Sequence, residues 1–189
     1  MLGPVEVAGF VASLTSGLRS IGVSAESYVS VSHRFGYDLT EKKQPLVVRL
    51  WRSLGSFRAT NASLSLPLKA VLLGFQFALS WLVIFRSIFI FDAYIYVFGK
   101  TFTNTRIELI FLRLLKKKII FVYLGSDARP PYMSGGYVTG VSPSRAAGRV
   151  VKASKRMSKT IQFQERKADY IVNAPGTGQF HQKKFVNWF

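Results

Sequence analysis

The sequence contains no cysteine and only two histidines. The absence of cysteine excludes disulfides and thiolate metal sites. His33 and His181 lie far apart in the sequence and lack the spacing of metal-ligand pairs, so we expect no metal site. The chain also lacks a P-loop lysine motif and the Gly-x-Ser-x-Gly elbow of hydrolases. These absences remove several common catalytic motifs from consideration.

Acidic residues are also scarce. Nine Asp and Glu residues stand against 26 Lys and Arg, and the formal net charge is +17. Such a balance predicts an anionic partner, which can be nucleic acid, an anionic membrane leaflet or a phosphorylated ligand. Hydrophobic residues make up 49% of the 189 residues, which is enough for a packed core. We therefore treat residues 1–189 as a single α/β domain.

The N-terminus has no basic region and contains an early acid, Glu6, so it does not predict a secretory signal. Residues 70–85 carry no charge and lie between Lys69 and Arg86. A membrane-spanning helix needs about 20 apolar residues, so this run favours a buried or membrane-skimming helix. A true span over residues 70–91 is the alternative. We expect a cytoplasmic protein that is peripheral to the membrane.

The periodicity of apolar residues predicts an alternation of helices and strands. The expected helices cover residues 6–21, 67–86, 105–118 and 143–167, and the expected strands cover residues 23–31, 91–98, 119–124 and 168–173. A strand ahead of the first helix is missing or reduced to a stub. Residues 32–65 are expected to form an irregular basic insertion with one short helix near residues 45–54. This order predicts a doubly wound, mostly parallel, Rossmann-like sheet.

The helix predicted to begin near residue 105 carries two end signals. Thr105 and Glu108 form a capping-box pattern. Three lysines, Lys116, Lys117 and Lys118, are expected in the last turn, where positive charge complements the helix dipole.

Candidate functional residues follow the predicted strands. They are Gly99 and Lys100, then Gly125, Ser126, Asp127 and Arg129, then Gly176 with Thr177 and Gly178. The carboxyl ends of parallel strands share one edge of the sheet, where ligands bind. Lys100 and Arg129 suit a phosphate or carboxylate. Asp127 is the best catalytic candidate, as an acceptor of sugar hydroxyls or a base, but it also suits a cap of the next turn or an ion pair with Arg129.

The predicted helix between Arg149 and Lys167 carries a basic face. It suits a solvated surface, docking on anionic lipid or binding of nucleic acid. No recognisable nucleic-acid module or interleaved aromatic residue accompanies it, so nucleic acid is disfavoured. A non-enzymatic basic module that binds membrane or nucleic acid remains the alternative function.

Two stretches carry a family resemblance. Phe91–Gly99 and Lys117–Arg129, with its Gly-Ser-Asp-Ala-Arg ending, resemble the N-terminal domain of GT-B glycosyltransferases, and more narrowly the retaining, nucleotide-sugar-dependent group. Gly3–Gly9 is similar to that family's first glycine-containing loop, and Ala168–Val172 to the strand before its domain crossover. Family members often carry a histidine at the strand end where this chain has Tyr123 and Leu124.

The resemblance implies one half of a GT-B fold, covering nearly all of the chain. It implies that an acceptor, a glycan or a lipid-linked sugar, is bound by Gly9, Gly99, Lys100, Gly125, Ser126, Asp127, Arg129 and Gly176. The nucleotide-sugar donor belongs to a second domain in such enzymes, so no cofactor is expected in this chain. Residue 189 stands about where the linker to that domain begins, so we expect a fragment that is inactive alone.

Overall fold

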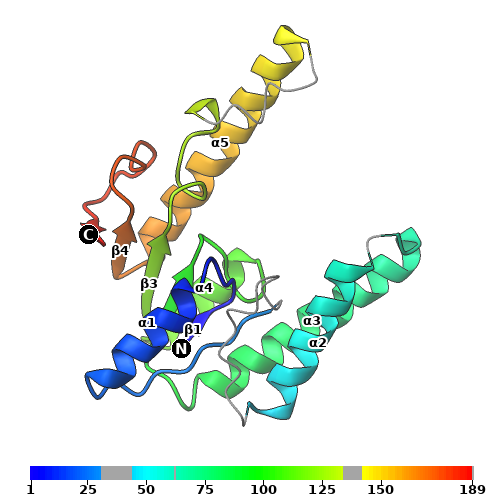
Figure 1. The fold of residues 1–189 in the computed structure, drawn as a ribbon, viewed down its shortest axis with the longest axis vertical. Coiled ribbons are helices and arrows are strands. Elements are labelled where there is room, and N and C mark those ends of the chain that lie inside the picture. Colours follow the sequence, from blue (N-terminus) through cyan, green and yellow to red (C-terminus); the bar gives the residue numbers. More distant parts are fainter. Residues whose placement is uncertain (31–43, 62, 134–141, 189) are drawn as a thin grey trace.

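The computed structural model describes residues 1–30, 44–61, 63–133 and 142–188. These residues form a five-stranded, all-parallel sheet in the order β1-β2-β3-β4-β5 (Figure 1). The strands are β1 (Leu2–Gly3), β2 (Ala93–Val97), β3 (Lys118–Tyr123), β4 (Tyr170–Asn173) and β5 (Val186–Asn187). The helices are α1 (Phe10–Ser20), α2 (Leu46–Thr60), α3 (Leu66–Ser87), α4 (Arg106–Leu114) and α5 (Pro143–Lys167), with a 3₁₀ turn at Pro131–Met133. The predicted α/β class with a parallel sheet is confirmed.

Helices cover both faces of this sheet. Tyr94 and Tyr96 of β2 point into the larger core, which the strands share with α2, α3, α4 and α5. Ile95 and Val97 point the other way, into a smaller cluster under α1. Because successive strand residues face opposite sides, a strand covered on both faces is apolar throughout. The continuous apolar runs at residues 93–98 and 119–124 reflect this double burial.

The first strand, β1, is a stub of two residues, as expected. Its pairing with residues 23–30 is short. Leu2 donates its N–H to Glu26 O and accepts from Tyr28 N–H, each at 2.9 Å. In the described residues 23–30 this pairing is one isolated bridge, Leu2 to Ser27, so the predicted strand over residues 23–31 is wrong. The composition suits a strand, but within the described residues only Ser27 forms a bridge with β1.

The first helix starts later than predicted, at Phe10, because residues 6–9 form its cap. Gly9 occupies the N-cap position with φ of 80°, and no N-cap side chain bonds to the helix. Glu6 instead accepts the N–H groups of Val11 and Ala12, each at 3.1 Å. A carboxylate at this end satisfies two free donors and complements the helix dipole.

The predicted insertion at residues 32–65 is only partly described, and residues 31–43 lie outside the described chain. The described remainder contains the helix expected near residues 45–54, but this helix, α2, runs for 15 residues to Thr60, so the prediction of irregular structure is wrong over residues 55–60. α2 and α3 pack together as a helical hairpin that projects from the sheet (Figure 1). Trp51 is buried between them and donates from Nε1 to Ser80 Oγ at 2.8 Å.

Both end signals predicted for α4 are corrected. Thr105 makes no side-chain cap bond. Glu108 instead reaches past it, and its carboxylate accepts Tyr96 Oη at 2.6 Å, Phe102 N at 3.1 Å, and Thr103 N and Oγ1 at 2.6 and 2.7 Å. The helix ends at Leu114, and Lys116 turns the chain with φ of 56°, so the three lysines lie beyond the last turn.

The tip of β3 turns at Gly125, whose φ is 135°. Asp127 holds this turn, because its Oδ1 accepts the N–H groups of Leu124 and Gly125 at 3.0 and 2.9 Å. An L-residue rarely adopts such a φ, so glycine is required here.

We expect Glu108→Gln to lower the free energy of unfolding by about 1–3 kcal/mol, because the amide NH₂ of glutamine faces donors that need an acceptor. Urea denaturation of the full chain measures the effect. Asp92→Asn, at a side chain that is fully exposed, is the matched control and should stay within about 1 kcal/mol of the parent. Equal effects of the two variants would contradict a structural role for the buried carboxylate.

We expect Gly125→Ala to destabilise the chain by about 1–3 kcal/mol, because alanine is strained at this φ. Gly148→Ala in α5 is the control, since its added Cβ meets nothing within 4 Å. It should stabilise the chain by up to about 1 kcal/mol through helix propensity. Thermal melts followed by circular dichroism compare the two, and a melting temperature unchanged by Gly125→Ala would refute the requirement for glycine.

Candidate functional site

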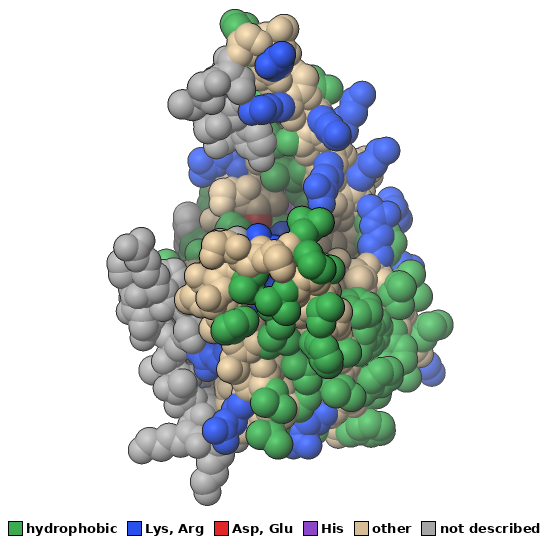
Figure 2. All heavy atoms as spheres, turned by 90° about the vertical axis from the view of Figure 1, so that its right-hand side faces the viewer, with side chains coloured by type: hydrophobic (Ala, Val, Ile, Leu, Met, Phe, Trp, Pro, Cys, Tyr) green, Lys and Arg blue, Asp and Glu red, His purple; other side chains and the backbone are tan. Residues whose placement is uncertain are grey.

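A cleft of about 1120 Å³ opens at the carboxyl edge of β2 and β3. Its walls are the loop after β2, the N-terminal end of α4 and one side of α5, and they include Phe98, Gly99, Lys100, Thr101, Asn104, Thr105, Arg106, Asp127, Arg149, Lys152, Arg156 and Gln164. The space-filling view shows a hollow below the projecting part of α5, with acidic and histidine atoms visible inside it (Figure 2). The cleft therefore lies where open parallel sheets bind ligands.

The structure brings some of the predicted residues to this cleft and leaves others beside it. Gly99, Lys100 and Asp127 line it. The other predicted residues follow their strands at the same sheet edge but are not part of the cleft wall: Gly9, Gly125, Ser126, Arg129 and Gly176. A Cβ placed on Gly99 would lie 3.2 Å from the Tyr123 ring and 4.0 Å from Asp127 Cβ. The tips of β2 and β3 are thus in close contact.

Asp127 has one carboxylate oxygen in use and one without a partner. Oδ1 caps the turn after β3, as the simpler of the sequence interpretations predicts. Oδ2 is buried and makes no hydrogen bond within the described residues. Burial raises the pKa of Asp127, and the backbone hydrogen bonds from its own turn only partly oppose this. No ion pair joins it to Arg129, although both residues are described.

Gln164 of α5 connects the two strand tips, which no sequence signal indicated. Its Oε1 accepts Tyr123 Oη at 2.6 Å, and its Nε2 donates to Gly99 O at 2.8 Å. Tyr123 is completely buried, and burial raises its pKa well above the ordinary value, so the phenol stays protonated as a donor. This bridge places α5 and the loop after β2 against the same cleft.

His181 and Glu165 form a buried pair that the sequence also left undetected. His181 Nδ1 lies 2.7 Å from Glu165 Oε1, and both side chains are nearly inaccessible to solvent. The His181 ring packs edge-on against Tyr123 at 5.0 Å between centroids. Its Nε2 is buried and has no hydrogen-bond partner in the described chain. Sixteen residues separate the pair in sequence, so only the fold brings them together.

The cleft walls are strongly cationic. Five basic side chains line the cleft, against the single carboxylate of Asp127: Lys100, Arg106, Arg149, Lys152 and Arg156. A neighbouring niche of about 470 Å³ is lined by Arg106, Lys152, Lys155, Arg156, Lys159 and Thr160. None of these cations forms an ion pair within the part of the chain that the structure describes. Phe163 supports one of them, because the Arg106 guanidinium lies 4.8 Å over its ring.

This geometry suits a polar, anionic ligand. Unpaired guanidinium and ammonium groups bind phosphate or carboxylate through charge-assisted hydrogen bonds. The N-terminal end of α4 at Thr105 and Arg106 adds the favourable end of a helix dipole. The free Oδ2 of Asp127 is an acceptor for a ligand hydroxyl. Within the described residues no group of three or more His, Asp or Glu side chains is arranged to hold a metal ion.

Comparison with protein-family models, with curated proteins and with solved structures found no match.

Proposed function

We propose that this chain is the acceptor-binding half of a glycosyltransferase. The complete enzyme would transfer a sugar from a nucleotide-sugar to a glycan or lipid-linked acceptor. The observation that carries the proposal is the cleft at the strand tips, which is lined by five cations without an ion pair in the described chain and by Asp127, whose Oδ2 has no hydrogen-bond partner there. A sugar acceptor that carries phosphate presents both a hydroxyl and an anion, and this combination matches the cleft.

Two features support a doubly wound sheet that forms half of a GT-B fold. Helices lie on both faces, with α1 on one and α4 and α5 on the other. The bridge to Ser27 lies on the side of β1 away from β2, so the order of chain segments reverses at β1. Such a reversal of strand order is typical of doubly wound sheets.

In this proposal different residues of the cleft bind the hydroxyl and the phosphate of the acceptor. Asp127 accepts a hydrogen bond from the acceptor hydroxyl through Oδ2 and thereby orients it. Lys152 and Arg156 bind the acceptor phosphate from α5. The nucleotide-sugar would be held by a second domain facing this cleft, so binding, not transfer, is the property to measure on this chain.

We expect Asp127→Asn to weaken binding of a hydroxyl-bearing acceptor by about tenfold or more, because a bond to a charged acceptor becomes a bond to a neutral one. The probes are methyl hexosides and hexose 1-phosphates, measured by saturation-transfer NMR and titration. Asp92→Asn is the control, since that carboxylate is fully exposed and pairs with Lys117 at 3.1 Å.

The pH dependence follows from the ionised form of Asp127. Burial raises its pKa above the ordinary 3.8, so binding should be lost as the pH falls through this raised pKa, and Asp127→Asn should not show that loss. Equal binding by the parent and by Asp127→Asn at neutral pH would remove Asp127 from the site. Binding of heparin without binding of any hexoside would favour the non-enzymatic basic module.

A second prediction concerns the phosphate. We expect Lys152→Gln and Arg156→Gln each to weaken hexose 1-phosphate binding about tenfold and to leave methyl hexoside binding unchanged, because each removes one charge-assisted bond. Lys167→Gln, at the far end of α5, removes the same charge outside the cleft and is the control. An equal loss with Lys167→Gln would mean that only the net charge matters.

A further inference from the structure

The long helix α3 buries its neutral polar side chains and exposes apolar ones, which is the reverse of an ordinary surface helix. Its three neutral polar side chains, Gln76, Ser80 and Ser87, lie within about 40° of one another around the helix axis, at ~100° per residue. This polar stripe faces inward. Gln76 bonds to Arg58 of α2, Ser80 accepts Trp51 Nε1 at 2.8 Å, and Ser87 bonds to Tyr94 of β2 at 2.8 Å. The apolar residues are therefore left on the outside.

These outward side chains, with those of the turn after α3 and the outer side of α4, form what we call the apolar face. On α3 it includes Leu66, Leu68, Val71, Leu73, Phe75, Phe77, Leu82 and Phe85. It continues through Phe89 and Ile90 to Ile107, Ile110 and Leu114. Phe111 joins the two helices, since its ring lies 5.5 Å from Phe85 and 5.9 Å from Trp81.

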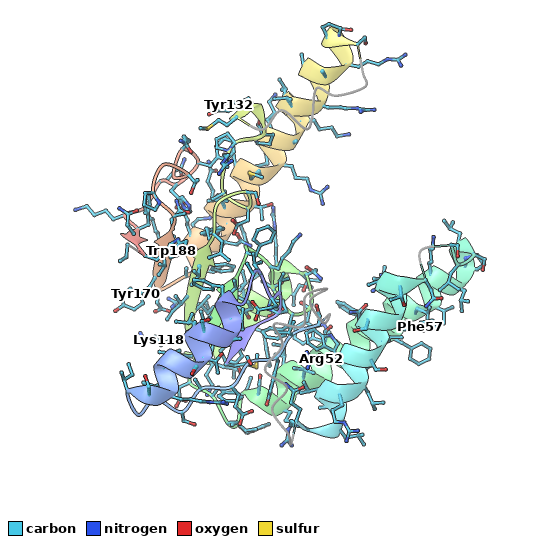
Figure 3. All side chains as sticks on the ribbon, in the orientation of Figure 1. Arg52, Phe57, Lys118, Tyr132, Tyr170 and Trp188 are labelled. Atoms are coloured by element: carbon cyan, nitrogen blue, oxygen red, sulfur yellow. The ribbon has the colours of Figure 1, made fainter. Side chains whose placement is uncertain are left out.

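The exposure is large and continuous. Leu66 is 84% exposed, Phe89 is 87% exposed and Phe75 is 63% exposed. Figure 2 shows hydrophobic side chains gathered over a wide area, with Lys and Arg side chains above them on the same side of the molecule. Phe57 of α2 also projects away from the body of the molecule (Figure 3). Contiguous apolar patches of this kind mark an interaction site on a protein surface.

The surroundings of the apolar face are cationic. Lys69 and Arg86 flank it on α3, and the basic side of α5 carries Lys152, Lys155, Arg156 and Lys159. Helices α1, α2 and α3 contain no acidic residue. The acids of α4 and α5, Glu108 and Glu165, are buried. No helix of the described chain therefore presents an exposed carboxylate.

We propose that the apolar face inserts into the anionic leaflet of a lipid bilayer, with α3 lying in the plane of the interface. A leaflet offers an apolar interior and a negative surface together, which complements an apolar face on helices that present cations and no exposed carboxylate. The side chains of the apolar face lie outside the cleft, whereas Lys152 and Arg156 of its cationic surroundings also line the cleft. The docking therefore goes beyond the proposed function, and substitutions within the apolar face test it independently of the cleft.

The in-plane orientation follows from the inward contacts. α3 is the one described helix that is long and apolar enough to cross a membrane. To cross it, α3 would have to leave its partners, because Val83 and Ile84 are completely buried in the core and Ser87 bonds to Tyr94. Lying flat keeps these contacts and buries only the outward residues in lipid.

Sedimentation with vesicles of phosphatidylcholine, with and without phosphatidylglycerol, tests the docking. We expect the full chain to bind the anionic vesicles, and Val71→Ser combined with Phe75→Ser to weaken this binding at least tenfold. Both positions are exposed, so the melting temperature should change little. Ile21→Ser, at a side chain 73% exposed just after α1, is the control and should bind like the parent.

A second set of variants tests the basic side chains around the apolar face. Lys155→Gln and Lys159→Gln lie outside the main cleft and should each weaken binding to anionic vesicles about fivefold, with no effect on binding of hexosides. Absence of binding by the parent chain, or equal binding by the Val71→Ser and Phe75→Ser variant, would overturn the proposal. Capture by a protein partner without any vesicle binding would also overturn it.

Insertion depth distinguishes lying in the plane from spanning. Because the chain has no cysteine, Gly74→Cys and Leu82→Cys each give a single labelling site, and an added Cβ at Gly74 meets nothing within 4 Å. Quenching of a fluorophore by nitroxide lipids of graded depth should place both labels at the same shallow level. A depth difference of about 12 Å, the spacing of these residues along the axis, would show a span and refute the in-plane orientation.

Discussion

The buried carboxylate of Glu108 holds together the parts of the chain that shape the cleft. It accepts hydrogen bonds from Tyr96 of β2, from Phe102 and Thr103 of the following loop, and it belongs to α4 itself. A buried carboxylate with fewer donors would be strongly unfavourable, so all of its donors must be in place at once. The loop after β2 and the N-terminal end of α4 therefore have fixed positions relative to the sheet. The Tyr96 ring extends this constraint by stacking on Phe121 of β3 at 5.1 Å.

The hydrogen bonds and ion pairs of the acidic side chains explain why many basic side chains have no acidic partner. The described acids serve caps, internal hydrogen bonds or local pairs: Glu6, Glu26, Asp92, Glu108, Asp127, Glu165 and Asp169. Because they are engaged elsewhere, the cations of α5 and of the cleft have no neutralising partner in the described chain. Charges of one sign that line a concave site focus the field within it. Part of the net charge of +17 is thus concentrated along α5 and in the cleft.

Sequence patterns located the elements whose signals are local and missed what depends on distant partners. The expected helix over residues 143–167 matches α5, which has Ser142 at its N-cap position and Pro143 in its first turn. The residues around Ser27 have strand composition, but they make only one isolated bridge to β1, and composition does not report how far a partner strand runs alongside. In the cleft, Asp127 was found because it follows a strand. Gln164 and the pair of Glu165 with His181 act across long sequence separations, and no periodicity reports such contacts.

The helix α3 shows a further limit of periodicity. Its apolar run was recognised, but apolar content alone does not say which side is buried. A polar stripe such as Gln76, Ser80 and Ser87 normally marks the side that faces water. Here the stripe lies against α2 and the sheet, because Trp51, Arg58 and Tyr94 supply hydrogen-bond partners for it. With its neutral polar side chains bonded internally, α3 has only Lys69 and Arg86 left as exposed polar side chains among its apolar residues. The solvent that suits such a surface is hydrocarbon, and the unpaired cations around it determine which sign of lipid headgroup it would meet.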